Sequence, residues 1–77
     1  MALITDADTA WSAPITLTTD EIWQARRGSV FVTTTPSPAA DDGMVLLRYH
    51  AVRLPAGSDV RYRKEGTDDV VIAHEAV

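Results

Sequence analysis

The chain of 77 residues contains no cysteine, so no disulfide can stabilise its fold. It also lacks any apolar run of the roughly 18 residues that a membrane-spanning helix requires. Only two histidines are present, which leaves few ligands for a transition metal. These absences point away from a disulfide-stabilised scaffold, a membrane span and a histidine-based metal centre.

Positive charge is also scarce, because 11 Asp and Glu residues outnumber 7 Lys and Arg residues and give a net charge of −4. A chain with this charge is poorly suited to coat nucleic acid or an anionic membrane. The first 14 residues contain Asp6 and Asp8 but no basic residue, unlike a secretion signal. We therefore expect a protein made in the cytoplasm, with no nucleic-acid partner and no membrane partner.

The small size limits the stability that one core can supply. At this length, the free energy gained by burying apolar surface nearly equals the entropy cost of ordering the chain. Small domains then commonly depend on disulfides, a bound metal or further subunits. Because the first two are not indicated here, we expect self-association. A monomer with an unusually well-packed core is the alternative.

The pattern of apolar and polar residues predicts about seven short strands, rich in the β-branched and aromatic residues that pleated surfaces favour. The expected strands span 15–19, 22–26, 29–35, 44–49, 50–54, 59–64 and 70–75. A helical turn that begins at Asp20 is the alternative for the second of them. This spacing is typical of an all-β fold, either a small sandwich or a jelly-roll-like barrel, here formed by residues 15–77. Residues 1–14 are expected to form an N-terminal arm or a first irregular edge.

The clearest alternation surrounds a tight turn at Pro55-Ala56-Gly57-Ser58. After the turn, Val60 and Tyr62 alternate with Arg61 and Arg63, so the two pairs should lie on opposite faces of one strand. We expect the turn to form a hairpin, with Arg53 on its other strand.

Residues 44–47, Met-Val-Leu-Leu, break the alternation because they are apolar at successive positions. Such a run predicts either a strand covered on both faces or a bulge that switches faces. The run follows the one long loop, residues 36–43, whose two prolines and Asp-Asp-Gly ending are typical of a turn.

Residues with catalytic or ligand-binding chemistry are few. His50 and His74 are not spaced as metal ligands on one strand or helix, so we interpret them as ordinary strand-end residues. The pairs Asp41-Asp42 and Asp68-Asp69 lack the spacing of a calcium loop and are interpreted as solvated turn acids. No cysteine nucleophile, Gly-x-Ser-x-Gly elbow or phosphate-binding glycine loop is present. We therefore predict a protein that is not an enzyme and has no cofactor or metal.

The cationic residues are more informative, since all seven lie between Arg26 and Lys64 and six of them are arginine. The planar arginine fork suits interfaces because it binds carboxylates in a bidentate manner. We therefore predict that an arginine face meets an acidic loop of a neighbouring subunit. Exposed pairs within the chain and a glycan or polyanion site are the alternatives. The candidate interface residues are Trp11, Arg53, Arg61, Arg63, Asp41 and Asp42.

The two tryptophans have different surroundings in the sequence. Trp23 is expected in or beside the core. Trp11 precedes Pro14 in a polar segment, where an aromatic side chain can anchor a neighbouring subunit. Burial of Trp11 within its own fold is the alternative. On a glycan-binding surface, either ring would be the residue that stacks on sugar.

The Pro55-Ala56-Gly57 turn resembles the second motif of cupins, small β-barrels that often hold a metal. In that motif a histidine ligand follows the turn, at the position of Val60 here. Tyr49 stands where the family has a glycine before the turn, and Lys64 stands where the family has an asparagine after the histidine. The resemblance implies a β-roll with a tight turn. At most it implies a small-ligand site without a metal.

Over most of its length the chain resembles small β-structured virion proteins of tailed bacteriophages and gene transfer agents. The segments that carry this resemblance are ITLTTDEIWQARRGSVFVTTTP, from residue 15, and LPAGSDVRYRKEG, from residue 54. It implies a virion-located decoration or cement protein that forms homo-oligomers, often trimers, and stabilises the shell of the major capsid protein. It supplies no catalytic residues. A tail or fibre accessory module that binds a host glycan is the alternative within the same group.

Overall fold

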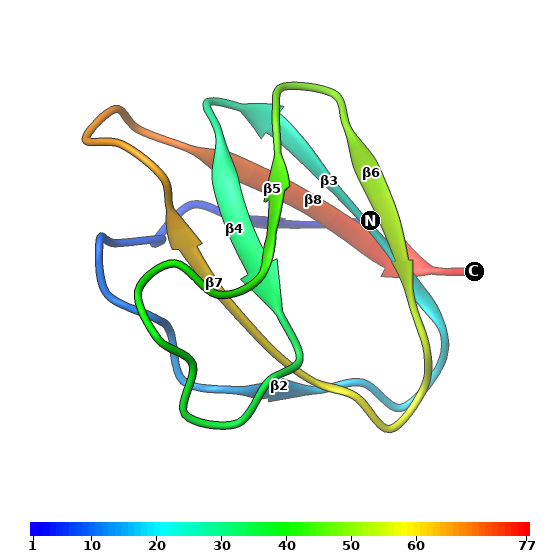
Figure 1. The fold of residues 1–77 in the computed structure, drawn as a ribbon. Helices are drawn as coiled ribbons and strands as arrows, with labels where there is room; N and C mark the ends of the chain where they lie inside the picture. Colours follow the sequence, from blue (N-terminus) through cyan, green and yellow to red (C-terminus); the bar gives the residue numbers. More distant parts are fainter.

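The computed structural model describes all 77 residues and contains eight strands and no helix. The strands form two four-stranded antiparallel sheets with the orders β1-β8-β3-β6 and β2-β7-β4-β5, which lie one over the other in Figure 1. Their bounds are β1 Ala2–Ile4, β2 Ile15–Thr16, β3 Glu21–Arg27, β4 Val30–Thr33, β5 Met44–Leu46, β6 Ala51–Leu54, β7 Asp59–Lys64 and β8 Val71–Ala76. The predicted all-β fold is confirmed. No helix exists that is long and apolar enough to cross a membrane.

The strand that sequence analysis did not predict is β1. It pairs with β8 so that Leu3 faces Ala73, and the neighbouring Ile4 enters the core. Farther along, the Ser12 N–H donates to the Tyr62 carbonyl at 2.9 Å, and the Lys64 N–H donates to the Asp8 carbonyl at 2.8 Å. Residues 1–14 therefore follow the edges of both sheets. The strand β1 lies within the segment for which we expected an N-terminal arm or a first irregular edge.

The core lies between the two sheets and is filled by alternate residues of each strand. The fully buried side chains come from both sheets and include Trp23, Val30, Val32, Val60 and Ile72. Trp23 of β3 reaches across the interior to Tyr62 of β7, with ring centroids 6.2 Å apart. The strand predicted at 22–26 and the core position predicted for Trp23 are both confirmed.

The turn at residues 55–58 does not form the expected hairpin. It connects β6 of one sheet to β7 of the other. The backbone of Leu17 forms the hydrogen bonds with Gly57 and Ser58 at the turn. The Leu17 N–H donates to the Ser58 carbonyl at 2.9 Å, and the Gly57 N–H donates to the Leu17 carbonyl at 2.7 Å. The prediction that Arg53 shares a hairpin with Arg61 is therefore wrong.

The apolar run 44–47 is not covered on both faces, as the sequence suggested. Only Leu46 is buried, whereas Met44, Val45 and Leu47 are 43%, 44% and 49% exposed. The reason is the position of β5 at the end of its sheet, where β4 is its only neighbour. An apolar edge strand thus remains open to solvent.

Candidate functional site

The outer face of the β2-β7-β4-β5 sheet carries a cluster of two aromatic rings and one guanidinium. Arg63 of β7 lies directly opposite Phe31 of β4, and its Cζ atom is 4.1 Å from the centroid of the Phe31 ring. The same Cζ atom is 5.4 Å from the centroid of the Trp11 ring, which lies 6.4 Å from Phe31. These distances allow cation–π attraction to both rings. We call these residues the Trp11–Phe31–Arg63 cluster.

The cluster holds the loop of residues 36–43 against the sheet. The indole N–H of Trp11 donates to the Ala39 carbonyl at 2.8 Å, and Arg63 donates to the Ala40 carbonyl. Within the loop, the Asp42 carboxylate accepts the Ala39 N–H at 2.8 Å. The loop and residues 1–14 are thereby joined on one surface, although they are distant in sequence.

Of the six predicted interface residues, the structure brings Trp11, Arg63 and Asp42 together. Arg61 lies on the same face of β7 and donates to the Ser12 carbonyl at 3.4 Å. Asp41 is exposed in the loop. Arg53 lies in the other sheet. The alternation predicted for Arg61 and Arg63 against Val60 and Tyr62 is confirmed, since the last two are buried.

Phe31 is the member of the cluster that the sequence analysis missed. Its two neighbours, Val30 and Val32, are fully buried, so strict alternation places Phe31 on the outer face. A large aromatic side chain on that face needs a partner, and Arg63 and Trp11 supply it. The alternation in residues 29–33 was therefore a usable signal.

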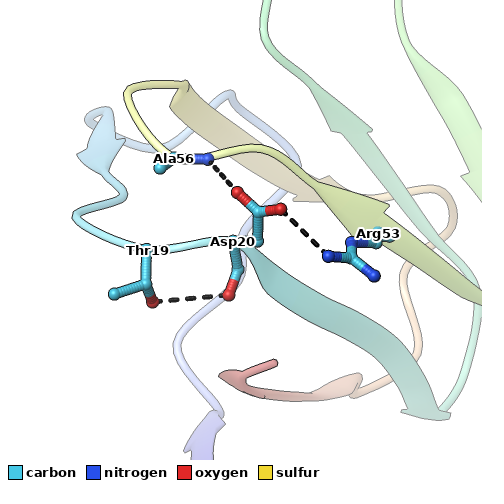
Figure 2. A network of polar contacts seen from close by, with 4 residues as sticks. All are labelled: Thr19, Asp20, Arg53 and Ala56. Carbon is cyan, nitrogen blue, oxygen red and sulfur yellow. Dashed lines mark hydrogen bonds and ion pairs between the residues drawn. The ribbon is translucent and has the colours of Figure 1, made fainter.

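Arg53 is held by its own fold, as Figure 2 shows. Its Nη2 atom lies 3.1 Å from Oδ2 of Asp20, whose Oδ1 accepts the Ala56 N–H at 2.9 Å. The Ala56 N–H and Arg53 both hold the pKa of Asp20 below its ordinary value of 3.8. Thr19 donates to the Asp20 carbonyl at 3.3 Å. Asp20 thus fixes the turn after β6, and the exposed ion pair adds little stability.

A second set of polar contacts, partly buried, joins side chains of β3 and β8 in the β1-β8-β3-β6 sheet. Glu21 Oε1 accepts the indole N–H of Trp23 at 3.1 Å and lies 2.9 Å from Nδ1 of His74. The His74 ring stacks on Trp23 with centroids 4.8 Å apart. This arrangement gives the buried indole its hydrogen-bond acceptor. No group of three or more His, Cys, Asp or Glu side chains is placed to hold a metal ion.

The position that resembles the cupin metal ligand is part of the core. Val60 is fully buried between the sheets, and its register partner is Ile15 of β2. Tyr49, which stands where the family has glycine, is 58% exposed and has a φ of 71°. The position that corresponds to the cupin ligand therefore serves packing.

A hollow of about 430 Å³ lies where residues 6–15 cross β7. Asp6, Asp8, Trp11 and Tyr62 are among its lining residues. The Tyr62 hydroxyl donates to Asp6 Oδ1 at 2.8 Å. Burial, together with this hydrogen bond and the charge of Asp6, raises the pKa of Tyr62 to about 12. The hollow thus combines an aromatic face with hydrogen-bonding acids.

Residues 44–49, which we call the 44–49 segment, form the largest run of exposed apolar side chains. Met44, Val45, Leu47 and Tyr49 are all between 43% and 58% exposed. β5 is also an edge strand, so one side of its backbone has no partner strand. Open edges of this kind are sites where another chain can add a strand.

The structure therefore presents two candidate interface surfaces, the Trp11–Phe31–Arg63 cluster with its loop and the 44–49 segment. They are adjacent, because Val45 of β5 faces Phe31 of β4. No family model, no curated protein and no solved structure matches this chain.

Proposed function

We propose that this chain is a non-enzymatic structural protein of a virion. In this role it self-associates and binds neighbouring subunits of the shell, as capsid decoration and cement proteins do. The observation that carries the proposal is the open apolar edge at the 44–49 segment. Proteins that stay monomeric usually protect such edges with charged residues, prolines or covering loops. Here Met44, Val45 and Leu47 stand unprotected at the edge.

The size of the apolar surface indicates how much partner contact is needed. Covering four half-exposed apolar side chains contributes roughly 1 kcal/mol each. Association costs on the order of 4 to 15 kcal/mol in lost translational and rotational freedom. The segment alone is therefore too small, and the interface must extend over backbone pairing along β5 and the adjacent cluster. A trimer, with a further contact to the major capsid protein, supplies this larger area.

The proposed action is mechanical. A protein that binds only assembled shell subunits stabilises the shell by mass action, and it needs no chemical step. Residues at the interface then act by burial, charge pairing and shape.

Sedimentation equilibrium over a wide range of concentration tests the proposal. We expect concentration-dependent association of the wild type. The double variant V45E/L47E should associate less and unfold at an unchanged temperature, because both side chains are exposed. The matched control T18E/T34E adds the same charge at two exposed positions and should associate like the wild type.

Cosedimentation with shells assembled from the major capsid protein tests the second contact. The wild type should sediment with the shells and raise the temperature at which they disassemble. A wild type that stays monomeric at every concentration and leaves the shells unchanged would contradict the proposal.

A tail or fibre accessory module that binds a host glycan is the second candidate. The observation in its favour is the hollow beside Trp11, because an aromatic face with Asp6 and Asp8 suits a sugar ring and its hydroxyls. Titration of oligosaccharides against tryptophan fluorescence tests it. Binding that is lost in W11A but kept in V45E/L47E would favour this candidate over the decoration protein.

A further inference from the structure

Three arginines meet in a groove that shares Arg48 and Tyr49 with the 44–49 segment. The groove has a volume of about 320 Å³ and lies at one end of the β1-β8-β3-β6 sheet. Its lining includes Arg26, Arg27 and Arg48, together with the apolar side chains of Leu3, Tyr49 and Val71. We call it the arginine groove.

A β-bulge explains how two successive arginines line the same groove. The register between β3 and β8 shifts between Ala25 and Arg27. In a regular strand Arg26 and Arg27 would point to opposite faces, whereas a bulge redirects one of them. Both side chains are exposed as a result. Three guanidinium groups are thus concentrated in a chain whose net charge is −4.

The three groove arginines have no acidic partner within the chain. The structure contains two contacts between basic and acidic side chains, Arg53 with Asp20 and His74 with Glu21. Arg48 lies over the Tyr49 ring, with Cζ 4.8 Å from the centroid, and Arg26 lies 3.9 Å from the Met1 sulfur. The groove therefore presents uncompensated positive charge beside apolar surface. A ligand that matches its charge carries exposed carboxylates.

The chain itself contains an acidic segment of this kind, at residues 65–69. Glu65, Asp68 and Asp69 are exposed, and none of them forms an ion pair. Val70, which follows them, is buried in the core, so the carboxylates are the part of the segment that a second molecule can reach. Most other acids are already occupied within the fold; those that accept hydrogen bonds include Asp6, Asp20, Glu21, Asp42 and Asp59.

The acidic segment and the arginine groove lie side by side in one molecule. Glu65 and Asp68 line a separate hollow of about 300 Å³ together with Gly28 and Val70. Arg27, which precedes Gly28, and Val71, which follows Val70, line the arginine groove. The segment nevertheless forms no ion pair with its own groove.

We propose that the arginine groove binds the acidic segment 65–69 of a second copy of this chain. The inference rests on the proposed self-association and names the charged part of its interface. Arginine binds carboxylates through paired, charge-assisted hydrogen bonds, which gives such a contact its orientation. Arg48 and Tyr49 extend the groove directly into the exposed 44–49 segment.

The geometry also favours a small closed assembly. A head-to-tail contact closes into a ring when successive copies turn sharply, and otherwise extends into a filament. Because the groove and the segment are neighbours and not at opposite ends, each contact turns the chain strongly. A trimer is a ring of this kind.

Charge-reversal variants test the inference by sedimentation equilibrium on the full chain. R27E/R48E makes the groove acidic, and D68K/D69K makes the segment basic. We expect the self-association of each variant alone to be at least about tenfold weaker than that of the wild type. An equimolar mixture of the two should recover part of the association, because unlike variants pair a groove with a segment of opposite charge. A ring of three then has two such contacts and keeps one contact of like charge.

Two controls keep the result interpretable. D59K/E75K produces the same change in net charge as D68K/D69K at two exposed acids outside the segment and outside both surfaces described above, and it should associate like the wild type. Thermal unfolding followed by circular dichroism checks that each variant is folded. We expect unfolding temperatures close to that of the wild type, because all the exchanged side chains are exposed.

The outcomes separate this inference from the proposed function. Variants that associate like the wild type overturn the inference, while self-association itself stands. Loss in R27E/R48E but not in D68K/D69K overturns segment 65–69 as the occupant and assigns the groove to a different part of the second copy, because no other protein is present. A wild type that never associates overturns both proposals.

Discussion

Phe31 and Arg63 face each other across β4 and β7, and the guanidinium carbon of Arg63 lies 4.1 Å from the centroid of the Phe31 ring. The pair lies beneath Trp11 and beside the loop of residues 36–43, whose Ala40 carbonyl accepts a hydrogen bond from Arg63. One cation thus joins a sheet, a loop and the N-terminal residues. Its main role in the isolated chain is to hold these parts together.

Replacing Arg63 by alanine is expected to lower the free energy of unfolding by about 1 to 2 kcal/mol, because two ring contacts and the loop carbonyl lose their partner. R61A is the matched control on the same face of β7, where the arginine makes one long contact, to Ser12, at 3.4 Å. It should cost less than about 0.5 kcal/mol. Urea unfolding measures both, and equal losses would contradict the role assigned to Arg63.

The strand β1 supplies a second comparison. Ile4 is 8% exposed and belongs to the core, whereas the neighbouring Leu3 is 55% exposed on the outer face. I4A should therefore lower the free energy of unfolding by about 2 to 4 kcal/mol, and L3A by less than about 1 kcal/mol. Thermal unfolding of the two variants measures the difference. If both were mild, residues 1–14 would be dispensable for folding.

Two glycines, Gly43 and Gly57, have a positive φ in the left-handed region. Gly43 has φ +95° and Gly57 has φ +85°, so alanine is strained at both. A Cβ at Gly43 would lie 2.8 Å from the Val32 carbonyl oxygen and 3.2 Å from the Trp11 ring, whereas a Cβ at Gly57 would have nothing within 4 Å.

G57A should therefore cost about 1 kcal/mol from backbone strain alone, and G43A about 2 to 4 kcal/mol, because backbone atoms must also move. Urea unfolding gives the two values. G43A should also change the fluorescence of Trp11, because the added Cβ would lie 3.2 Å from its ring. Equal costs in the two variants would show that the loop yields freely and does not pack on the cluster.

Much of the fold could be predicted because local alternation is a direct consequence of strand geometry. The predicted strand 59–64 matches β7, and the strand predicted at 70–75 differs from β8 by one residue at each end. Val60 and Tyr62 lie inside and Arg61 and Arg63 outside, as a period of two requires. These features depend only on neighbouring residues.

The features that were missed depend on distant residues. The turn chemistry of residues 55–58 indicated a hairpin, but β6 pairs with β3, and β7 pairs with β2 and β4. The apolar run 44–47 carries no sign that β5 is an edge strand. β1 is only three residues long, so it shows no periodicity. The arginine groove depends on a bulge between β3 and β8, which needs both strands in register.

Tyr62 provides the clearest expected dependence on pH. Its hydroxyl donates to Asp6 at 2.8 Å, and burial together with this bond raises its pKa from 10.0 to about 12. Between these values the unfolded chain has lost the tyrosine proton while the folded chain keeps it. Deprotonation therefore favours the unfolded chain, and the free energy of unfolding falls as the pH rises through this interval.

The expected loss attributable to Tyr62 is on the order of 2 to 3 kcal/mol by about pH 12, and none of it appears below about pH 9. Y62F keeps the ring beside Trp23 but has no proton to lose. It should start about 1 kcal/mol less stable, because Asp6 loses its donor, and then show a shallower decline at alkaline pH. Urea unfolding of both proteins at a series of pH values gives the difference directly, since every other titrating group is common to the two. Parallel curves would show that the hydroxyl of Tyr62 titrates alike in the folded and unfolded chains, and the contact with Asp6 would then have no part in holding residues 1–14 to β7.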